Sequence, residues 1–435
     1  MKNLSLLLLL FPLFLSAQMV FQKEITFNGN IGITDMAKLP DEGFLATAFT
    51  SNATLDSTRA VLIRFDSLLQ PLWCKSFNMQ AKDDFRCITP SDNGNFLVGG
   101  TSRYEFSNEN GCTLFKFDVD GNVLWHKMYD GSYDDATIGI FDGGSGTIDM
   151  VVRKGVTGSP AKIIQTDAAG NLMNDYSVET TNSLSGVLPD CAATGGTDNH
   201  YIGGTALNET TGKYMFFLAR ITDASVTWYK EYDFDRDAGY LYDVAVLADG
   251  EILATGNITS ENSPNNNSAA VMKVNAGTGN IIWAKEIKQS NDYNITSYEV
   301  AENSNGELFA MGRANTDFGV EGYVCKMDAS GNVIWAREYG DGPYENIGFA
   351  REVGGNRMLF SGKMGSDQGP YFIQADVDGS TPCLTSLLGC VSSDISETIY
   401  SPAIILDNPD LTAVSLPLTT NNLNLGENVV CSGIV

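Results

Sequence analysis

A short pattern recurs seven times along the 435-residue chain, and it constrains the fold more than any other feature. The copy at Asp328–Trp335 reads Asp-Ala-Ser-Gly-Asn-Val-Ile-Trp, and the apolar stretch Tyr323–Met327 precedes it. The copies are separated by 52, 49, 56, 52, 53 and 48 residues and begin at Asp66, Asp118, Asp167, Asp223, Asn275, Asp328 and Asp376. A period near fifty residues is typical of a repeat architecture, in which no single unit buries its own core.

The repeat from Tyr240 to Ile287 predicts four short strands separated by turn residues. The expected strands are Leu241–Leu247, Glu251–Gly256, Ala269–Val274 and Ile281–Ile287. No stretch of the chain shows a capped apolar period of 3.6 residues, so helices should be scarce. A parallel β-helix would have much shorter repeats, and a TIM barrel would have helices between its strands. We therefore predict an all-β fold, a seven-bladed β-propeller of four-stranded antiparallel blades.

A large apolar residue follows most anchors and should begin the last strand of each blade. It is Trp73, Trp125 and Trp335 seven positions after the Asp, while Trp283 and Trp228 stand at slightly shifted places. We interpret this row of tryptophans as core between blades, rather than as a platform on which ligands stack. The third and seventh copies have Asn174 and Cys383 in this place, and those units are degenerate.

The two ends of the chain bear on ring closure. Phe21–Phe27 resembles the last strand of a repeat, yet it precedes the first complete unit. Cys383–Leu388 competes with it for the seventh blade, and we expect the N-terminal segment to pair there. The propeller should span residues 20–388. Residues 391–435 contain no Lys or Arg, and we expect 389–435 to be an extended C-terminal tail or linker.

Residues 1–17 are predicted to be a signal peptide. Lys2 supplies a positive start, Leu4–Leu15 an apolar run, and Leu15–Ala17 a cleavage site. The chain has 27 basic and 53 acidic residues, and this balance argues against nucleic acid or an anionic membrane surface as a partner. We expect an exported protein in the periplasm, at the cell surface or outside the cell, with an acidic surface that favours solubility.

The eight cysteines are mostly dispersed among different repeats, which is unusual for a disulfide framework. We expect Cys74 and Cys87 to stay unpaired, because they should lie on an outermost and an innermost strand of neighbouring blades. Any bridge should join two of the three cysteines near the C-terminus, Cys383, Cys390 and Cys431.

Two resemblances follow from these residues. Asn275–Trp283 resembles the repeat of pyrroloquinoline-quinone-type propellers. Trp335–Asn346, together with Asn305–Gly312, is similar to exported propeller repeats common in Bacteroidetes. The resemblance implies the fold and export, but one propeller fold serves many activities. A quinone enzyme of that superfamily would have more blades and a dedicated pocket, so we expect no cofactor.

The search for catalytic motifs finds little. The chain has only two histidines, His126 and His200, and neither belongs to a spaced metal set. Asp118–Asn122 could hold calcium through oxygen ligands, but the same residues make a hairpin turn, which we favour. Thr222–Trp228 resembles the Asp box of sialidase propellers imperfectly, and a shortened turn explains it better. Asp233–Asp237 is read as a solvated acidic loop.

Two functions remain open. We favour a non-catalytic binding or scaffold module at the cell envelope or outside the cell, with a protein or glycan partner and no catalytic, cofactor or metal residues. Its contacts should come from the long polar loops Ser51–Thr58, Ser102–Gly111 and Ser260–Ser268. The alternative is an envelope or secreted glycan hydrolase with paired carboxylates at the mouth of the central channel.

Overall fold

The computed structural model describes residues 19–434 except for gaps at 27–29, 52–56, 81, 104–109, 131–135, 144–145, 154–160, 181–186, 197–198, 209, 223–224, 260–266, 291–292, 318, 341–345, 355–356, 364–368, 377, 382–384, 389, 396–397, 401–403, 408–411, 415–418 and 423–425. The expected signal peptide lies outside this part of the chain. None of the described residues forms a helix with the length and hydropathy that a membrane crossing requires.

Most of the chain forms units of four antiparallel strands. Two neighbouring units are β2 (Asn30–Lys38), β3 (Phe44–Ser51), β4 (Thr58–Phe65), β5 (Pro71–Asn78) and β6 (Lys82–Pro90), β7 (Phe96–Arg103), β8 (Asn110–Phe117), β9 (Val123–Asp130). The next two are β10 (Ala136–Asp142), β11 (Thr147–Arg153), β12 (Ala161–Asp167), β13 (Leu172–Thr180) and β14 (Val187–Thr194), β15 (Asn199–Asn208), β16 (Lys213–Thr222), β17 (Ser225–Asp233). A short 3-10 turn, η1 (Asp92–Gly94), lies between β6 and β7 in the unit of β6–β9.

The remaining units follow the same order. They are β18 (Ala238–Val246), β19 (Ile252–Thr259), β20 (Asn267–Val274), β21 (Ile281–Gln289) and β22 (Ile295–Glu302), β23 (Leu308–Thr316), β24 (Gly319–Met327), β25 (Val333–Tyr339), then β26 (Asn346–Gly354), β27 (Arg357–Lys363), β28 (Pro370–Gln374) with β1 (Met19–Thr26). The strands of the example repeat thus lie within a few residues of their expected bounds.

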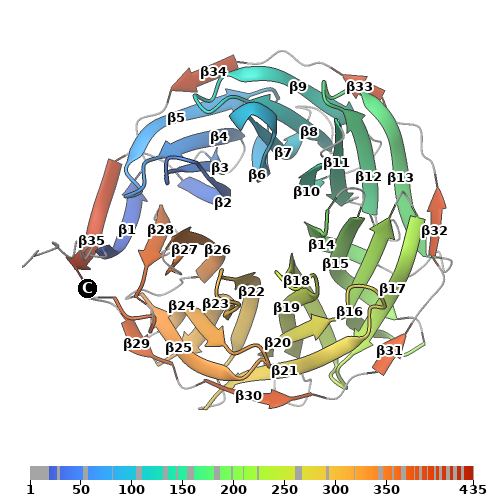
Figure 1. Ribbon diagram of the computed structural model, residues 1–435, viewed down its shortest axis with the longest axis vertical. Helices are drawn as coiled ribbons and strands as arrows, with labels where there is room; N and C mark the ends of the chain where they lie inside the picture. The colour runs from blue at the N-terminus through green and yellow to red at the C-terminus, as the bar shows by residue number, and fades with distance from the viewer. Residues whose placement is uncertain are drawn as a thin grey trace, which may run out of the picture.

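The units form a ring. Hydrogen bonding groups the strands into five sheets, two of which join a pair of units through the single parallel pairs Thr58–Lys82 and Tyr214–Ala238. Figure 1 shows the first strand of each unit at the centre and the fourth at the outside. Four-stranded antiparallel sheets arranged around a central opening are the architecture of a β-propeller.

The N-terminal strand closes this ring. Phe21–Glu24 of β1 pairs antiparallel with Tyr371–Gln374 of β28, as expected from the unpaired strand at the start of the sequence. Phe21 and Ile25 are buried in one cluster with Phe372 and with Ile31 of the next unit. The N-terminal segment, rather than Cys383–Leu388, therefore completes the unit of β26–β28.

The C-terminal residues differ from the expected tail or linker. They form short strands that each pair antiparallel with the outermost strand of one unit. We call this segment, residues 385–434, the belt; its strands are β29 (Thr385–Leu387), β30 (Cys390–Asp394), β31 (Thr398–Tyr400), β32 (Ile404–Asp407), β33 (Thr412–Val414), β34 (Thr419–Asn422) and β35 (Gly426–Ile434). Figure 1 shows them as arrows along the outer rim.

The Asp, Gly and Trp residues of the repeated pattern lie where neighbouring units contact each other. Gly331 and Gly379 have positive φ values of 78° and 79° in the anchor turns, where glycine is least strained. A Cβ at either glycine would lie 2.7 Å from the tryptophan ring of the preceding unit, Trp283 or Trp335. The indole of Trp283 also donates to Ala329 O at 3.1 Å. The tryptophans thus lie between units as expected, although most of them are only half-buried.

A tyrosine four residues after the tryptophan strengthens this contact in some units. The hydroxyl of Tyr339 donates to Gly379 O at 2.6 Å. Tyr129 and Tyr232 make the same contact with Gly170 and Gly279, at 2.7 and 2.8 Å. The repeat is therefore preserved where one unit packs on the turn of the next.

The described cysteines are largely free thiols. Cys74 and Cys87 are unpaired, as expected, and they lie on β5 and β6 of neighbouring units. Cys390 is also unpaired, so the bridges that would have involved it are wrong. Cys383 lies outside the described residues, and a Cys383–Cys431 bridge stays a prediction.

Candidate functional site: the central channel

The innermost strands line a cavity of about 530 Å³ at the centre of the ring. Every first strand contributes to its wall: β2, β6, β10, β14, β18, β22 and β26. Each of these strands contains a β-bulge, at Thr34, Arg86, Ile138, Asp190, Tyr242, Tyr298 and Gly348. Bulges redirect side chains and are common beside functional sites, so the bulge and the residue after it define the candidate site.

A glycine on the second strand accompanies the bulge in most units. Gly312 pairs with Ser297, the residue before the bulge on β22, and a Cβ there would overlap the carbonyl oxygen of Thr296. Gly100 approaches Asp84 O in the same way. Because only glycine allows the two backbones to come so close, these glycines fix the geometry of the channel wall.

Charged side chains meet on one side of the channel. Arg351 of β26 forms ion pairs with Asp35 of β2 and with Glu299 of β22, and its Nη1 lies 3.1 Å from Glu299 Oε1. The guanidinium Nε also donates to Met36 O at 2.9 Å. The side chains of Asp35 and Glu299 are 18% and 16% exposed, so water in the channel still reaches both carboxylates.

Each carboxylate on this side also accepts a backbone N–H from the following unit. Asp35 Oδ2 accepts from Ile88 at 3.0 Å, and Asp243 Oδ2 accepts from Val300 at 3.0 Å. Glu299 Oε1 accepts from Ala350 at 3.1 Å. The same position of successive repeats therefore links one unit to the next through a carboxyl acceptor.

The position in the channel perturbs the ionisation of these groups. Burial raises the pKa of Asp243 to about 7, against the lowering effect of the N–H groups of Val300 and Val244. Burial also raises the pKa of Glu299 well above its usual value, although Arg351 opposes this shift. Burial lowers the pKa of Arg351, but Asp35 and Glu299 outweigh it and hold the guanidinium charged. A carboxyl that titrates near neutrality can hold or release a proton at physiological pH.

The opposite side of the channel has different chemistry. The residues equivalent to Asp35, Asp243 and Glu299 are Cys87, Gly139 and Cys191, and burial raises the pKa of both thiols. Neither thiol therefore has the thiolate character of a nucleophile. Among the described residues that line the cavity on this side, the one acid is Asp190, whose Oδ1 lies 3.0 Å from Arg153 Nη1.

Two tyrosines complete the wall. The rings of Tyr242 and Tyr298 lie 5.3 Å apart, and the guanidinium of Arg313 lies 5.7 Å from the Tyr298 ring centre. Burial raises the pKa of Tyr242 to about 12, so its hydroxyl is a neutral donor. Paired rings beside carboxylates and guanidinium groups can bind a polar ligand by stacking and hydrogen bonding.

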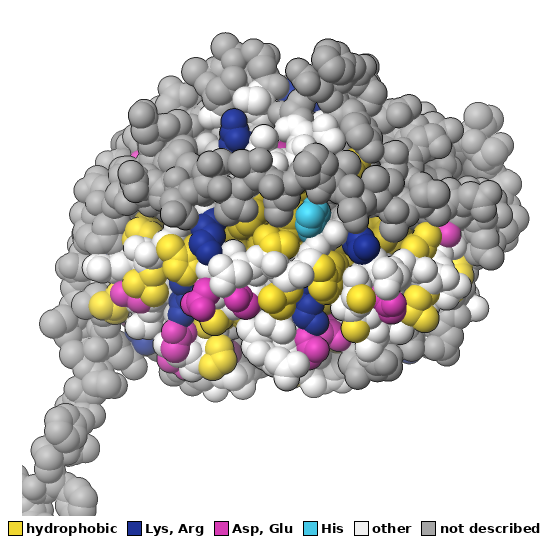
Figure 2. Space-filling view, turned by 90° about the horizontal axis from the view of Figure 1, so that it is seen from above, with side chains coloured by type: hydrophobic (Ala, Val, Ile, Leu, Met, Phe, Trp, Pro, Cys, Tyr) yellow, Lys and Arg dark blue, Asp and Glu magenta, His cyan; other side chains and the backbone are white. Residues whose placement is uncertain are grey.

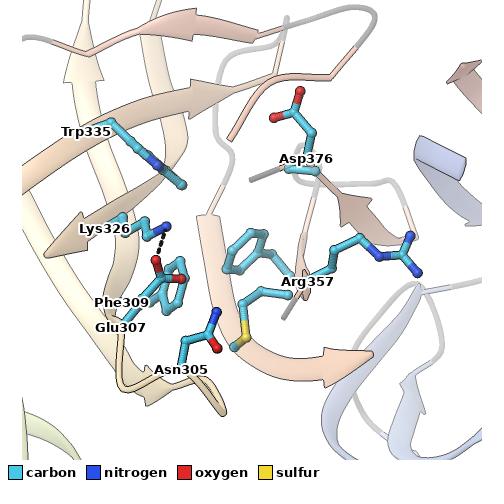
Figure 3. Close-up of a pocket in the computed structure, with 10 residues that line it drawn as sticks. Asn305, Glu307, Phe309, Lys326, Trp335, Arg357 and Asp376 are labelled. Atoms are coloured by element: carbon cyan, nitrogen blue, oxygen red, sulfur yellow. Dashed lines mark ion pairs between the residues drawn. The ribbon is translucent and has the colours of Figure 1, made fainter. Parts of the chain in front are cut away.

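A second cavity is much smaller. It has a volume of about 110 Å³ and lies between the β22–β25 unit and β27 and β28. Figure 3 shows Trp335, Lys326 and Glu307 on one side and Arg357 and Asp376 on the other, with Lys326 Nζ 2.7 Å from Glu307 Oε1. This volume suits a few water molecules rather than a substrate.

The residues singled out in the sequence have structural roles. Asp118 Oδ1 accepts from the N–H groups of Asp120 and Asn122, and its Oδ2 accepts from the Asn122 amide, so it stabilises its own turn. No group of three or more potential ligands for a metal occurs among the described residues. At the imperfect Asp box, Thr222 at the end of β16 pairs with Ser225 at the start of β17, and Asp223 lies outside the described residues.

The two histidines lie apart. His200 is buried, with its Nε2 2.9 Å from Asp149 Oδ2 and its ring stacked on Phe141. His126 stacks on Phe115 in another unit. Most residues of the loops Ser51–Thr58, Ser102–Gly111 and Ser260–Ser268 fall outside the described part of the chain. Figure 2 shows acidic, basic and apolar side chains interspersed over one side of the ring.

The carboxylates of the channel were not predicted from the sequence. In most units the repeated Asp lies in an exposed turn after the third strand, whereas the channel residues lie on the first strands. A signal was present, because the bulged residues from Thr34 to Tyr242 are spaced by 52 residues each time. Reading the sequence at that spacing aligns Asp35, Cys87, Gly139, Cys191 and Asp243.

No protein-family model and no curated protein matches this chain. Among solved structures it is similar in outline to the β-propeller domain of the Trilobed protease from Pyrococcus furiosus, with 8% identity, a TM-score of 0.46, and coverage of 82% of this chain and 100% of that one. A protein of unknown function from Dyadobacter fermentans aligns with 9% identity, a TM-score of 0.44, and coverage of 82% and 98%. Sqt1 from Chaetomium thermophilum aligns with 8% identity, a TM-score of 0.43, and coverage of 80% and 99%.

Proposed function

We propose that this chain is an exported, non-catalytic β-propeller of seven blades that acts as a binding or scaffold module at the cell envelope or outside the cell. One observation carries the non-catalytic part. Asp35, Asp243 and Glu299 each accept a backbone N–H of the neighbouring unit, and Asp35 and Glu299 also pair with Arg351. Each of these contacts occupies an acceptor position of the carboxyl, which supports a role in joining units rather than in acting on a substrate.

Sequence features support the other parts of the proposal. Seven copies of the anchor support seven blades. Export is supported by Lys2 and the apolar run Leu4–Leu15. The partner is a protein or a glycan, and its contacts come from the loops that join the second and third strands, since these vary most between repeats.

A glycan hydrolase is the second candidate, and one observation favours it. Asp243 has a pKa of about 7 in a cavity of about 530 Å³, and Glu299 lies in the same wall. A glycosidase needs one protonated and one ionised carboxyl across a cleft, and a pKa near neutrality is what a general acid requires.

One experiment separates the two functions. The mature protein would be tested against a panel of glycans for hydrolysis and, in parallel, used to capture partners from envelope extract. We expect no turnover, and we expect capture to be lost when residues 51–58, 102–111 and 260–268 are replaced by short turns. Turnover that disappears in Asp243→Asn and Glu299→Gln, but persists in Asp120→Asn on an exposed turn, would reject the binding proposal.

A further inference from the structure

The belt follows the rim in the reverse order of the chain. Its strands pair antiparallel, one unit after another, as β29 on β25, β30 on β21, β31 on β17, β32 on β13, β33 on β9, β34 on β5 and β35 on β1. Figure 1 shows this path around the circumference. The outermost strand of each unit therefore has its edge paired by a segment that is distant in sequence.

The sequence of the belt suits a series of short edge strands. Between two and four residues separate consecutive belt strands. Pro402, Pro409 and Pro417 all fall in these intervals, outside the strands. Proline lacks an N–H for a ladder bond, so its restriction to the intervals leaves every belt strand able to pair.

The ring is closed without the belt. β1 pairs with β28, and Phe21 and Ile25 lie in a buried cluster with residues of the neighbouring unit. In the first part of the belt, the side chains of Leu388, Cys390 and Ile395 join hydrophobic clusters of the ring. Backbone pairing at a sheet edge joins the belt to every unit, which is how extended peptides bind by strand addition.

The belt is attached unevenly. β35 pairs with β1 at eight positions, whereas the other belt strands pair at three to five positions each. A contact of three residues is weak alone, and it forms because the neighbouring contacts keep the segment close to its edge. The individual contacts can therefore open while β35 keeps the segment on the ring.

From these observations we propose that the outer rim is a binding site for extended polypeptide, and that the belt is a ligand of this site supplied by the same chain. The site consists of the outer edges of β5, β9, β13, β17, β21, β25 and β1. The belt can leave and rebind while the ring stays closed. A belt from a second copy, added after the first has been removed, occupies the same edges.

The test uses the full chain with a protease site inserted after Leu388, which separates β30–β35 from the ring upon cleavage. All five tryptophans precede the belt, so the unfolding transition seen in tryptophan fluorescence is that of the ring. We expect the cleaved segment to elute with the ring in buffer and to be lost at a denaturant concentration below the start of that transition. A labelled peptide of residues 390–435 should then bind the stripped ring in a 1:1 ratio.

Variants of the peptide show whether strand pairing holds it. Alternate N–H groups of a strand face its partner, so either Asn428 or Val429 donates its N–H to β1. Of the two peptides Asn428→Pro and Val429→Pro, the one that loses this N–H should bind the stripped ring at least tenfold more weakly. The matched Asn428→Ala and Val429→Ala peptides keep their N–H groups and should bind like the unchanged peptide. The proposal would be overturned if the belt dissociated only in the transition in which the ring unfolds. It would also be overturned if the stripped ring did not bind the peptide.

Discussion

The two sides of the channel use the same strand position in opposite ways. On one side, which we call the acid arc, Asp243, Glu299, Arg351 and Asp35 connect five consecutive units through hydrogen bonds of their side chains. On the other side, the thiol arc, Cys87, Gly139 and Cys191 occupy the place of the carboxylates. The bulge is therefore common to all units, whereas the side chain that joins a unit to its neighbour is not. The acid arc should therefore respond more strongly to pH and to charge than the thiol arc, whose equivalent positions contribute by packing.

The largest effect should come from the glycine that both arcs share. Gly312→Ala on the acid arc and Gly100→Ala on the thiol arc would each bring a Cβ into a backbone carbonyl of the first strand. We expect both to lower the free energy of unfolding by about 3 kcal/mol, because the backbone must move. Denaturant titration of both variants measures this. Effects that differ by more than about 1 kcal/mol would show that the wall is not built alike on the two arcs.

Removal of Arg351 should destabilise the acid arc alone. Arg351→Met leaves Asp35 and Glu299 without a cation, and losing one partner of a buried pair costs about 3–5 kcal/mol. One third of the Arg351 side chain is exposed, so we expect about 2–3 kcal/mol in a denaturant titration at pH 7. The matched control is Arg86→Met, whose partner Asp84 lies on its own strand, and it should change stability by less than about 1 kcal/mol. Equal effects of the two variants would contradict the comparison.

Sequence reasoning predicted the framework better than the site. The repeat, the strand order and the closing strand follow from local patterns, because turn residues and alternating apolar residues determine where strands begin and end. The belt could not be predicted in this way, since strands of three residues such as Thr398–Tyr400 have no local signature and are defined by the edge they meet. The acid arc was missed for a similar reason. Nothing near Asp243 in the sequence indicates that Val300 of the next unit donates to it.

The pH dependence of stability should differ between the arcs. Burial raises the folded-state pKa of Asp243 to about 7, above its ordinary value, so the folded state binds the proton more tightly than the unfolded state. Asp243 therefore lowers the free energy of unfolding as pH rises from about 4 to about 7, and its contribution is constant above that. Asp243→Asn removes this slope. The free energy of unfolding of the variant minus that of the unmodified chain should therefore be about 1–2 kcal/mol larger at pH 8 than at pH 5.

The thiol arc provides the control for this pH effect. Burial also raises the pKa of Asp190, but Arg153 opposes the shift, so Asp190→Asn should flatten the pH profile less than Asp243→Asn does. Unfolding titrations of both variants at pH 5, 6, 7 and 8 give the two slopes. A steeper change for Asp190→Asn would reverse the assignment of the arcs.

The smallest effect should come from the thiols. Cys191 is buried, and a Cβ at Gly203 would lie 3.0 Å from its sulfur, so Cys191→Ala removes one packed atom and no charged hydrogen bond. We expect a loss of about 1 kcal/mol that is the same at pH 5 and at pH 8, because burial keeps the thiol neutral throughout this range. The same neutrality should make Cys191 react slowly with iodoacetamide in the folded chain at pH 8 and rapidly once the chain is unfolded. A loss of stability that grows with pH, or fast alkylation of the folded chain, would show that the thiol position itself carries charge, and the contrast between the two arcs would then fail.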